Sequence, residues 1–251
     1  MITLSPAFLT TPIAHRGLHD RSQGRIENAP QSFGAAIRHG YGIELDVQLS
    51  SDGQAMVFHD YTLDRLTHDK GPVAMRSRAE LESIQLKDTT DAIPALADVL
   101  AQISGQMPVV IEIKDQDGAM GPNVGPLEQA VADCLSAYNG DAAVMSFNPH
   151  SMVAFVDMCD TRAIGLVTDR FDDSDWPTVP KARRAELRDI PDLAKCSGSF
   201  ISHNQGQLDM DVVADLKSKG THILCWTIRS ETAETHARRI VYNVTFEDYL
   251  A

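Results

Sequence analysis

Residues 42–47 read Gly-Ile-Glu-Leu-Asp-Val, and in this stretch apolar and acidic residues alternate. Successive side chains of a strand point to opposite faces, so one face here is apolar and the other carries Glu44 and Asp46. Residues 111–114, Ile-Glu-Ile-Lys, repeat the pattern and place Glu112 and a lysine on one face. A surface strand with its polar face in solvent would show the same sequence pattern. The meaning of these acids therefore depends on the fold around them.

Short β-like runs recur along the chain, and helical patterns separate most of them. The runs are residues 13–16, 42–47, 109–114, 142–147, 163–168, 199–202, 222–228 and 240–245. Alternation of strands and helices predicts parallel strands joined by crossover helices. Eight such units in 251 residues favour an α/β fold of the TIM-like (β/α)8 barrel type. An open, doubly wound sheet is the alternative.

Amphipathic segments between these runs predict helices. The clearest, at residues 96–103 and 127–135, show one apolar stripe and follow a proline, which suits the first turn of a helix. Two further segments, at residues 33–37 and 212–216, are followed by a glycine, which suits the left-handed cap at a helix end. The helical patterns thus support the alternating fold.

Residues 49–93 interrupt the alternation. A Ser-Asp-Gly turn at 51–53, followed by the apolar run 55–58, predicts a short hairpin. The residues that follow, 60–93, are polar and irregular. We expect one domain over residues 1–251, with the insertion at roughly 49–93 over the mouth of the barrel.

The composition is that of a globular protein, with 43% hydrophobic and 23% charged residues. No apolar stretch is long enough to predict a membrane span. The first residues lack the basic and apolar regions of a secretory signal, so we expect a cytoplasmic protein. With 22 basic and 35 acidic residues the formal charge is −13, which argues against nucleic-acid binding. A small phosphorylated substrate needs only a local positive site and remains compatible.

The three acids Glu44, Asp46 and Glu112 predict a metal site. Both faces of an all-parallel sheet are usually covered, so the acids would point into the barrel. Buried carboxylates are unfavourable unless they are paired or bound to a metal. Oxygen ligands select a hard divalent cation, Mg²⁺ or Ca²⁺, over zinc. Lys114 would share the inward face and either balance this charge or contact a substrate phosphate.

Two histidines stand at predicted strand ends. His15 precedes Arg16 and Gly17 at the end of the first run, and His59 ends the hairpin. A lone histidine there is more often structural, but two beside an acidic metal site supply an acid and a base near neutral pH. Arg16 offers a planar fork of donors for phosphate oxygens. It faces the site only if the chain already turns there, because strand side chains alternate.

In this order, the residues resemble the glycerophosphodiester phosphodiesterase family, specifically its bacterial cytoplasmic type. The matching segments are residues 14–17 (Ala-His-Arg-Gly), 27–28 (Glu-Asn), 44–47, 52–53, 59–60 with Leu63 and Arg65, 93–96 and 111–114. The resemblance implies a TIM barrel with a small insertion after the second strand. It also implies metal-dependent hydrolysis of glycerophosphodiesters to sn-glycerol 3-phosphate and an alcohol.

The resemblance also implies roles for the residues at the metal. His15 and His59 would be the general acid and base. Glu44, Asp46 and Glu112 would bind the divalent cation, Mg²⁺ or Ca²⁺. Hydrolysis could pass through a cyclic phosphate or use direct attack by water.

Further residues are expected around this centre. Arg16 would contact the phosphate, and Lys114 lies close enough on the same face to do so as well. Trp226 could line the pocket for the alcohol, although core packing would explain it equally well. Glu27 and Asn28 match the family's Glu-Asn step and are expected to support the metal site from outside.

Two positions depart from the family pattern. The family often ends its last strand with a Thr-Asp pair, where residues 244–247 here read Val-Thr-Phe-Glu, and Ala29 replaces a usual threonine. We expect neither departure to touch the chemistry, but either could alter the substrate preference. Six other histidines are expected to have no role: His19, His39, His68, His150, His222 and His236.

Two other functions are compatible with the same residues. A phospholipase D-like or phosphoinositide-cleaving relative would use the site on a lipid and would favour an apolar rim or a basic patch. A catalytically silent barrel would only bind metal or phosphate. Turnover of glycerophosphocholine with added Mg²⁺ or Ca²⁺ separates these alternatives.

Overall fold

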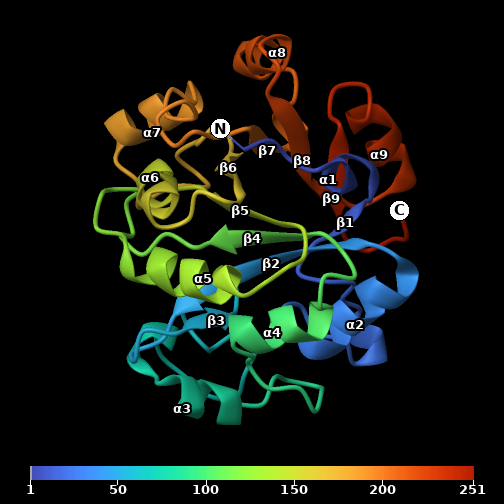
Figure 1. Ribbon diagram of the computed structural model, residues 1–251, viewed down its shortest axis with the longest axis vertical. Coiled ribbons are helices and arrows are strands. Elements are labelled where there is room, and N and C mark those ends of the chain that lie inside the picture. Colours follow the sequence, from blue (N-terminus) through green and yellow to red (C-terminus); the bar gives the residue numbers. More distant parts are fainter. Residues whose placement is uncertain (1) are drawn as a thin grey trace.

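The computed structural model describes residues 2–251, and its centre is a barrel of parallel strands surrounded by helices (Figure 1). The strands are β1 (Ile13–Ala14), β2 (Gly42–Leu49), β4 (Val109–Ile113), β5 (Ala142–Ser146), β6 (Ala163–Thr168), β7 (Phe200–Asn204), β8 (His222–Ile228) and β9 (Asn243–Phe246). β1 pairs in parallel with both β2 and β9, which closes the barrel. The predicted TIM-like barrel is confirmed, and the open sheet is excluded.

Helices follow the strands along the chain. They are α2 (Pro30–His39), α4 (Leu96–Ile103), α5 (Pro126–Ser136), α6 (Pro149–Met158), α7 (Lys181–Arg188), α8 (Asp211–Ser218) and α9 (Glu231–Ala237). The helical sequence patterns correspond to α2, α4, α5 and α8. α2 ends at Gly40, whose φ of 73° is the left-handed conformation expected there. Within residues 2–251, no helix has both the length and the apolar character needed to cross a membrane.

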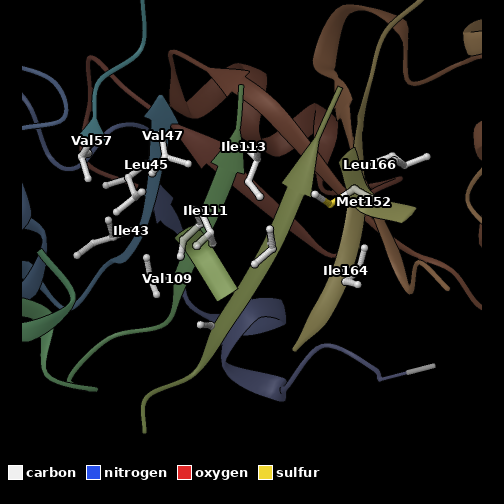
Figure 2. Packing of buried hydrophobic residues seen from close by; sticks show 14 of the residues in the cluster. Ile43, Leu45, Val47, Val57, Val109, Ile111, Ile113, Met152, Ile164 and Leu166 are labelled. Carbon is white, nitrogen blue, oxygen red and sulfur yellow. The ribbon is translucent and has the colours of Figure 1, made fainter. Parts of the chain in front are cut away.

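The main core lies between the barrel and the helices. It takes the odd-numbered residues of β2 and β4, which are Ile43, Leu45, Val47, Val109, Ile111 and Ile113 (Figure 2). The opposite face of these strands lines the barrel interior, where Val110 packs with Met145 and Phe200. Since successive strand residues alternate, the even-numbered acids of β2 and β4 face this interior.

The short helix α1 (Pro6–Thr10) covers the N-terminal end of the barrel. Leu4 and Phe8 belong to the apolar cluster inside the barrel. Asn243, the first residue of β9, donates hydrogen bonds to the carbonyl oxygens of Phe8 and Thr11 at 2.8 and 2.6 Å. Because α1 covers this end, the polar side chains of the barrel interior lie at the opposite, C-terminal end of the strands.

The insertion after β2 contains β3 (Ala55–Val57) and α3 (Arg78–Ser83), which lies at the lower edge of the view in Figure 1. β3 pairs antiparallel with β2, as the predicted hairpin requires. The insertion has its own apolar cluster, which includes Met56, Phe58 and Leu63. The backbone N–H of Phe58 donates to the carbonyl oxygen of Asp46 at 3.0 Å. This pairing brings the next residue of the hairpin to the barrel mouth.

The last strand begins later than the sequence pattern suggests, at Asn243 rather than at residue 240. The backbone N–H groups of Ile240 and Val241 both donate to the carbonyl oxygen of Ala237, so these residues continue the turn that ends α9. As a result, Glu247 directly follows β9 at the C-terminal end of the barrel.

Candidate active site

Three buried carboxylates meet inside the C-terminal end of the barrel. Glu44 and Asp46 lie two residues apart on β2, and Glu112 on β4 is the register partner of Asp46. These residues are only 2%, 1% and 7% exposed, respectively. One oxygen from each lies within 4.8 Å of the other two. The structure thus brings together the three acids that the sequence assigned to a metal site.

The charge of this cluster is only partly compensated within the chain. Lys114 Nζ lies 3.2 Å from Asp46 Oδ1 and 2.7 Å from Glu112 Oε1. Burial and the neighbouring carboxylates raise the pKa of Glu44 well above its usual value. Burial would also raise the pKa of Asp46, but the positive charges of Lys114, His59, Arg16 and His15 together outweigh it and hold this pKa well below its usual range. A buried, acidic, all-oxygen donor set with one uncompensated carboxylate fits a hard divalent cation.

Asn28 holds one of these acids in place. Its amide donates to Asp46 Oδ2 at 2.8 Å, and its carbonyl oxygen accepts from the backbone N–H of Asp46 at 3.1 Å. The neighbouring Glu27 instead binds two arginines, at 2.6 Å to Arg16 and at 2.7 and 2.8 Å to Arg65. Burial opposes the ionisation of Glu27, but these arginines lower its pKa to about 2. Both residues therefore act through their neighbours rather than at the centre of the cluster.

Arg16 lies over the acids because the chain turns at this residue. Its φ is 53° and that of Gly17 is 77°, so β1 has already ended. Its backbone N–H donates to Glu44 Oε2 at 2.9 Å. In its side chain, Nε lies 3.3 Å from Asp46 Oδ2 while a terminal nitrogen binds Glu27. The condition set by the sequence, that the chain must turn before Arg16 can face the site, is met.

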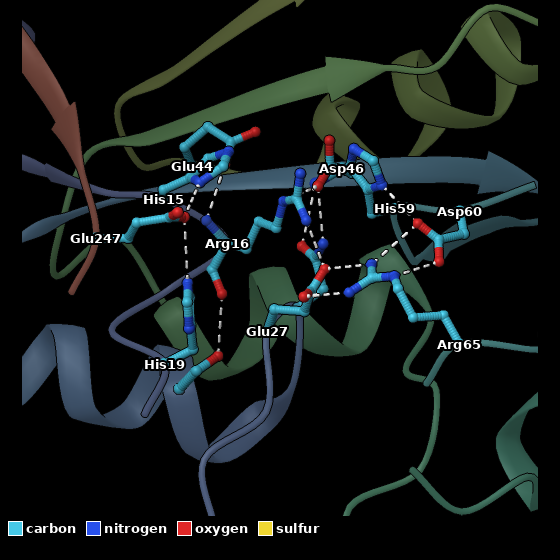
Figure 3. Close-up of polar contacts among 12 residues, drawn as sticks. His15, Arg16, His19, Glu27, Glu44, Asp46, His59, Asp60, Arg65 and Glu247 are labelled. Atoms are coloured by element: carbon cyan, nitrogen blue, oxygen red, sulfur yellow. Dashed lines mark hydrogen bonds and ion pairs between the residues drawn. The ribbon is translucent and has the colours of Figure 1, made fainter. Parts of the chain in front are cut away.

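A carboxylate orients His59 at the mouth. Its Nδ1 lies 2.7 Å from Asp60 Oδ1, and Arg65 binds the same carboxylate at 2.6 and 2.9 Å. Arg65 also binds Glu27, which continues the chain of contacts to Arg16 (Figure 3). With Nδ1–H donated to Asp60, the Nε2 atom of His59 is left to exchange a proton.

His15 has a comparable carboxylate partner, Glu247. Their Nδ1 and Oε2 atoms are 2.5 Å apart, and His15 Nε2 lies 4.0 Å from Glu44 Oε2 (Figure 3). The departure at the chain's last strand therefore puts an acid in direct contact with His15, a contact that the sequence pattern did not predict. Closure of the barrel pairs β9 with β1, and this pairing puts Glu247 beside His15. The signal in the sequence was Glu247 itself, an acid directly after the last strand.

The surroundings of His15 favour its neutral form. Burial lowers the pKa of His15, although the hydrogen bond that His15 donates to Glu247 opposes this effect. Arg229 binds the other oxygen of Glu247, with Nε 2.7 Å from Oε1. A neutral His15 that donates Nδ1–H to Glu247 keeps an unprotonated Nε2 on the side of the acids.

An aromatic wall formed by Phe147, Trp176 and Trp226 lies at the same end of the barrel. Trp226 on β8 meets Phe147, which follows β5, with ring centroids 5.5 Å apart. β5 and β8 are not neighbours in the sheet, so these rings approach across the barrel mouth. Trp176 packs on Phe147 at 4.8 Å, and all three side chains are half-buried. Trp226 thus packs against other rings and still presents surface at the mouth.

The geometry suits acid–base chemistry on a phosphate ester. Both histidines lie close enough to Asp46 to lower the pKa of its carboxyl group. Each has a carboxylate on Nδ1, so each presents Nε2 for proton transfer. Arg16 adds a cationic fork beside the buried acids. The pair of histidines can therefore take a proton from one oxygen and give a proton to another.

Comparisons with known proteins agree with this chemistry. A family model described as "Glycerophosphoryl diester phosphodiesterase family" matches residues 15–246. A protein of Caldanaerobacter subterraneus named "Glycerophosphodiester phosphodiesterase" is 32% identical over 168 residues. The match covers 63% of this chain and 66% of the relative, so it spans slightly less than two thirds of that protein.

Solved structures have the same fold. A phosphodiesterase of Oleispira antarctica, solved in complex with the product sn-glycerol-3-phosphate, superimposes with a TM-score of 0.78. It is 25% identical, and the match covers 96% of this chain and 94% of that one. A glycerophosphodiester phosphodiesterase from Thermotoga maritima gives a TM-score of 0.70 at 21% identity, with 94% of each chain covered. The second likeness concerns the fold alone.

Proposed function

Because the chain belongs to the glycerophosphoryl diester phosphodiesterase family, we propose that it hydrolyses glycerophosphodiesters to sn-glycerol 3-phosphate and an alcohol in a reaction that requires a divalent cation. The observation that carries this proposal is the arrangement of His15 and His59. Each is held by a carboxylate, and both lie close to a cluster of three buried acids.

The cation, Mg²⁺ or Ca²⁺, would be held by Glu44, Asp46 and Glu112. When bound, it supplies positive charge that stabilises the phosphate oxygens and favours ionisation of the attacking hydroxyl. Asn28 keeps Asp46 in position for this role, and Lys114 balances part of the negative charge.

The histidine pair performs the proton transfers. One histidine removes the proton from the attacking oxygen, and the other protonates the oxygen of the departing alcohol. The attacking oxygen is either the glycerol hydroxyl next to the ester, which gives a cyclic phosphate, or a water molecule. In the first case the two histidines exchange roles when water opens the ring, so both routes use the same pair.

Other side chains of the mouth bind the substrate. Arg16 contacts the phosphate, because its guanidinium lies over the acids and offers several donors. Trp226 borders the space for the alcohol from the aromatic wall. Lys114 is held between Asp46 and Glu112 and adds positive charge to the site.

Glu247 is a positioning residue in this proposal. We expect Glu247→Gln to lower kcat by roughly 10- to 100-fold, by analogy with the loss of a hydrogen-bonded partner of a metal-ligating histidine. Glutamine keeps an acceptor for Nδ1–H but removes the charge that stabilises a protonated His15. Steady-state kinetics give the result, and KM and the melting temperature should change little. An unchanged kcat would show that Glu247 only packs against His15.

The function is tested by identifying the product. We expect glycerophosphocholine and glycerophosphoethanolamine, supplied with Mg²⁺ or Ca²⁺, to release sn-glycerol 3-phosphate, which a coupled dehydrogenase assay quantifies. Phosphatidylcholine and phosphatidylinositol are tested as alternative substrates. A lipid substrate favours an apolar rim, and in the insertion Tyr61 and Met75 are 53% and 74% exposed. Release of phosphocholine instead, or turnover of the lipids alone, would contradict the proposed substrate class.

A further inference from the structure

A second group of potential metal ligands lies beside the acid cluster. One ring nitrogen of His15, one of His19 and an oxygen of Glu247 all lie within 4.8 Å of one another. Glu247 Oε2 is 2.5 Å from His15 Nδ1 and 3.5 Å from His19 Nε2 (Figure 3). The three residues come from the end of β1, the loop that follows it and the end of β9. This group contains two imidazoles, whereas the acid cluster contains oxygen ligands alone.

His19 has an unused nitrogen in this group. Its side chain is 20% exposed, but its Nε2 atom is buried and makes no hydrogen bond to any residue from 2 to 251. A buried polar atom without a partner costs stability. His19 Nε2 nevertheless lies 3.5 Å from the same carboxylate oxygen that His15 uses. A cation between these atoms would give His19 Nε2 a direct bond in place of the hydrogen bond that it lacks.

We propose that His15, His19 and Glu247 bind a borderline transition-metal ion such as Zn²⁺, and that this ion inhibits the enzyme. Two imidazole nitrogens and one carboxylate oxygen form a typical zinc donor set that leaves a fourth position for water. Arg229 occupies the other carboxylate oxygen, so Oε2 is the atom that binds the ion. The inhibition rests on the proposed function, and the binding does not.

The spacing of the ligand atoms is close to what zinc needs. Zinc bonds of about 2.0–2.1 Å in a tetrahedral site separate neighbouring ligand atoms by roughly 3.3 Å. The 3.5 Å between His19 and Glu247 already matches this separation. His15 and Glu247, now joined by a 2.5 Å hydrogen bond, would have to move apart by about 1 Å. A small rotation of the Glu247 carboxylate and the His15 ring provides such a shift.

Zinc binding changes the proton that His15 carries. In the free site, Nδ1 bears the hydrogen and Nε2 has the lone pair. Zinc takes the lone pair of Nδ1, so the neutral ring must carry its hydrogen on Nε2. The proton leaves Nδ1 and one is taken up at Nε2 from solvent, with no change in the number bound. His15 then cannot accept a proton at Nε2, which it must do once in each cycle whether it acts as the base or as the acid, and the reaction stops.

Binding is measured first, without substrate. Chelator-treated protein is saturated with Ca²⁺ to fill the acid cluster and is then titrated with Co²⁺, whose visible absorption reports nitrogen and carboxylate ligands. We expect one bound ion in the parent protein and binding at least about 10-fold weaker in His19→Gln. Asp46→Asn, which alters the acid cluster, should keep the absorption. Equal Co²⁺ binding in the parent protein and His19→Gln would overturn the site.

Inhibition is measured next, at saturating Ca²⁺ with glycerophosphocholine as substrate. His19→Gln should keep its basal activity and melting temperature, and should need at least about 10-fold more Zn²⁺ for half inhibition. Inhibition that excess Ca²⁺ relieves, with equal Zn²⁺ sensitivity in both proteins, would place zinc at the acid cluster and contradict the proposal. A protein that binds Co²⁺ through His19 but hydrolyses no phosphodiester would refute the proposed function and leave the metal site standing.

Discussion

Replacing His15 or His59 with alanine is expected to lower kcat by at least about 100-fold, the usual scale for losing a general acid or base. Each histidine is fixed by a carboxylate at Nδ1 and has no other structural duty of comparable weight. Metal binding and the melting temperature should therefore change little. The double variant should lose less kcat than the product of the two single-variant losses, because both groups act in one transition state.

The control for this prediction lies in the same insertion as His59. His68 is exposed and makes no side-chain hydrogen bond within residues 2–251, so His68→Ala should leave kcat unchanged. Steady-state kinetics with glycerophosphocholine and calorimetric binding of Ca²⁺ provide the two measurements. A variant that loses stability but keeps its kcat would return that histidine to a structural role.

Asp46→Asn is expected to abolish most cation-dependent activity. Asp46 is the acid that Asn28, Lys114 and Arg16 all contact, so its position is the most tightly defined of the three. Asparagine has nearly the same shape but lacks the charge. A bound cation contributes several kcal/mol of charge stabilisation, which corresponds to at least about 100-fold in kcat.

The matched control for Asp46 is an acid far from the site. Asp157 is exposed on α6, and Asp157→Asn should leave both activity and Ca²⁺ binding unchanged. Calorimetric titration of chelator-treated protein with Ca²⁺ measures binding directly. If Asp46→Asn bound Ca²⁺ as tightly as the parent protein, the cation would have to lie elsewhere.

The barrel and the acids of the site could be predicted because their signals are local. Alternation in residues 42–47 and 111–114 depends only on the geometry of a strand, and it placed Glu44, Asp46 and Glu112 on one face. Glycine after α2, a proline shortly before α4 and a proline at the first position of α5 marked helix ends for equally local reasons. By contrast, α1 has only five residues and shows no periodic stripe.

Contacts that depend on closure of the barrel could not be predicted in this way. His15 and Glu247 are 232 positions apart, and only the pairing of β1 with β9 brings them together. The backbone conformation of Arg16 could not be predicted either, because a positive φ is rare for arginine. It follows from the turn at Gly17. The local sequence patterns predicted which side chains share a face of a strand. Closure of the barrel determines which of these side chains contact residues from distant parts of the chain.

The most direct test of the account is the release of sn-glycerol 3-phosphate from glycerophosphocholine by chelator-treated protein, measured before and after Mg²⁺ or Ca²⁺ is added back. We expect no release without a cation, recovery in the parent protein when either ion is restored, and no recovery in Asp46→Asn. Turnover that resists the chelator, or an Asp46→Asn variant that recovers fully, would contradict the claim that hydrolysis depends on a cation held by Glu44, Asp46 and Glu112.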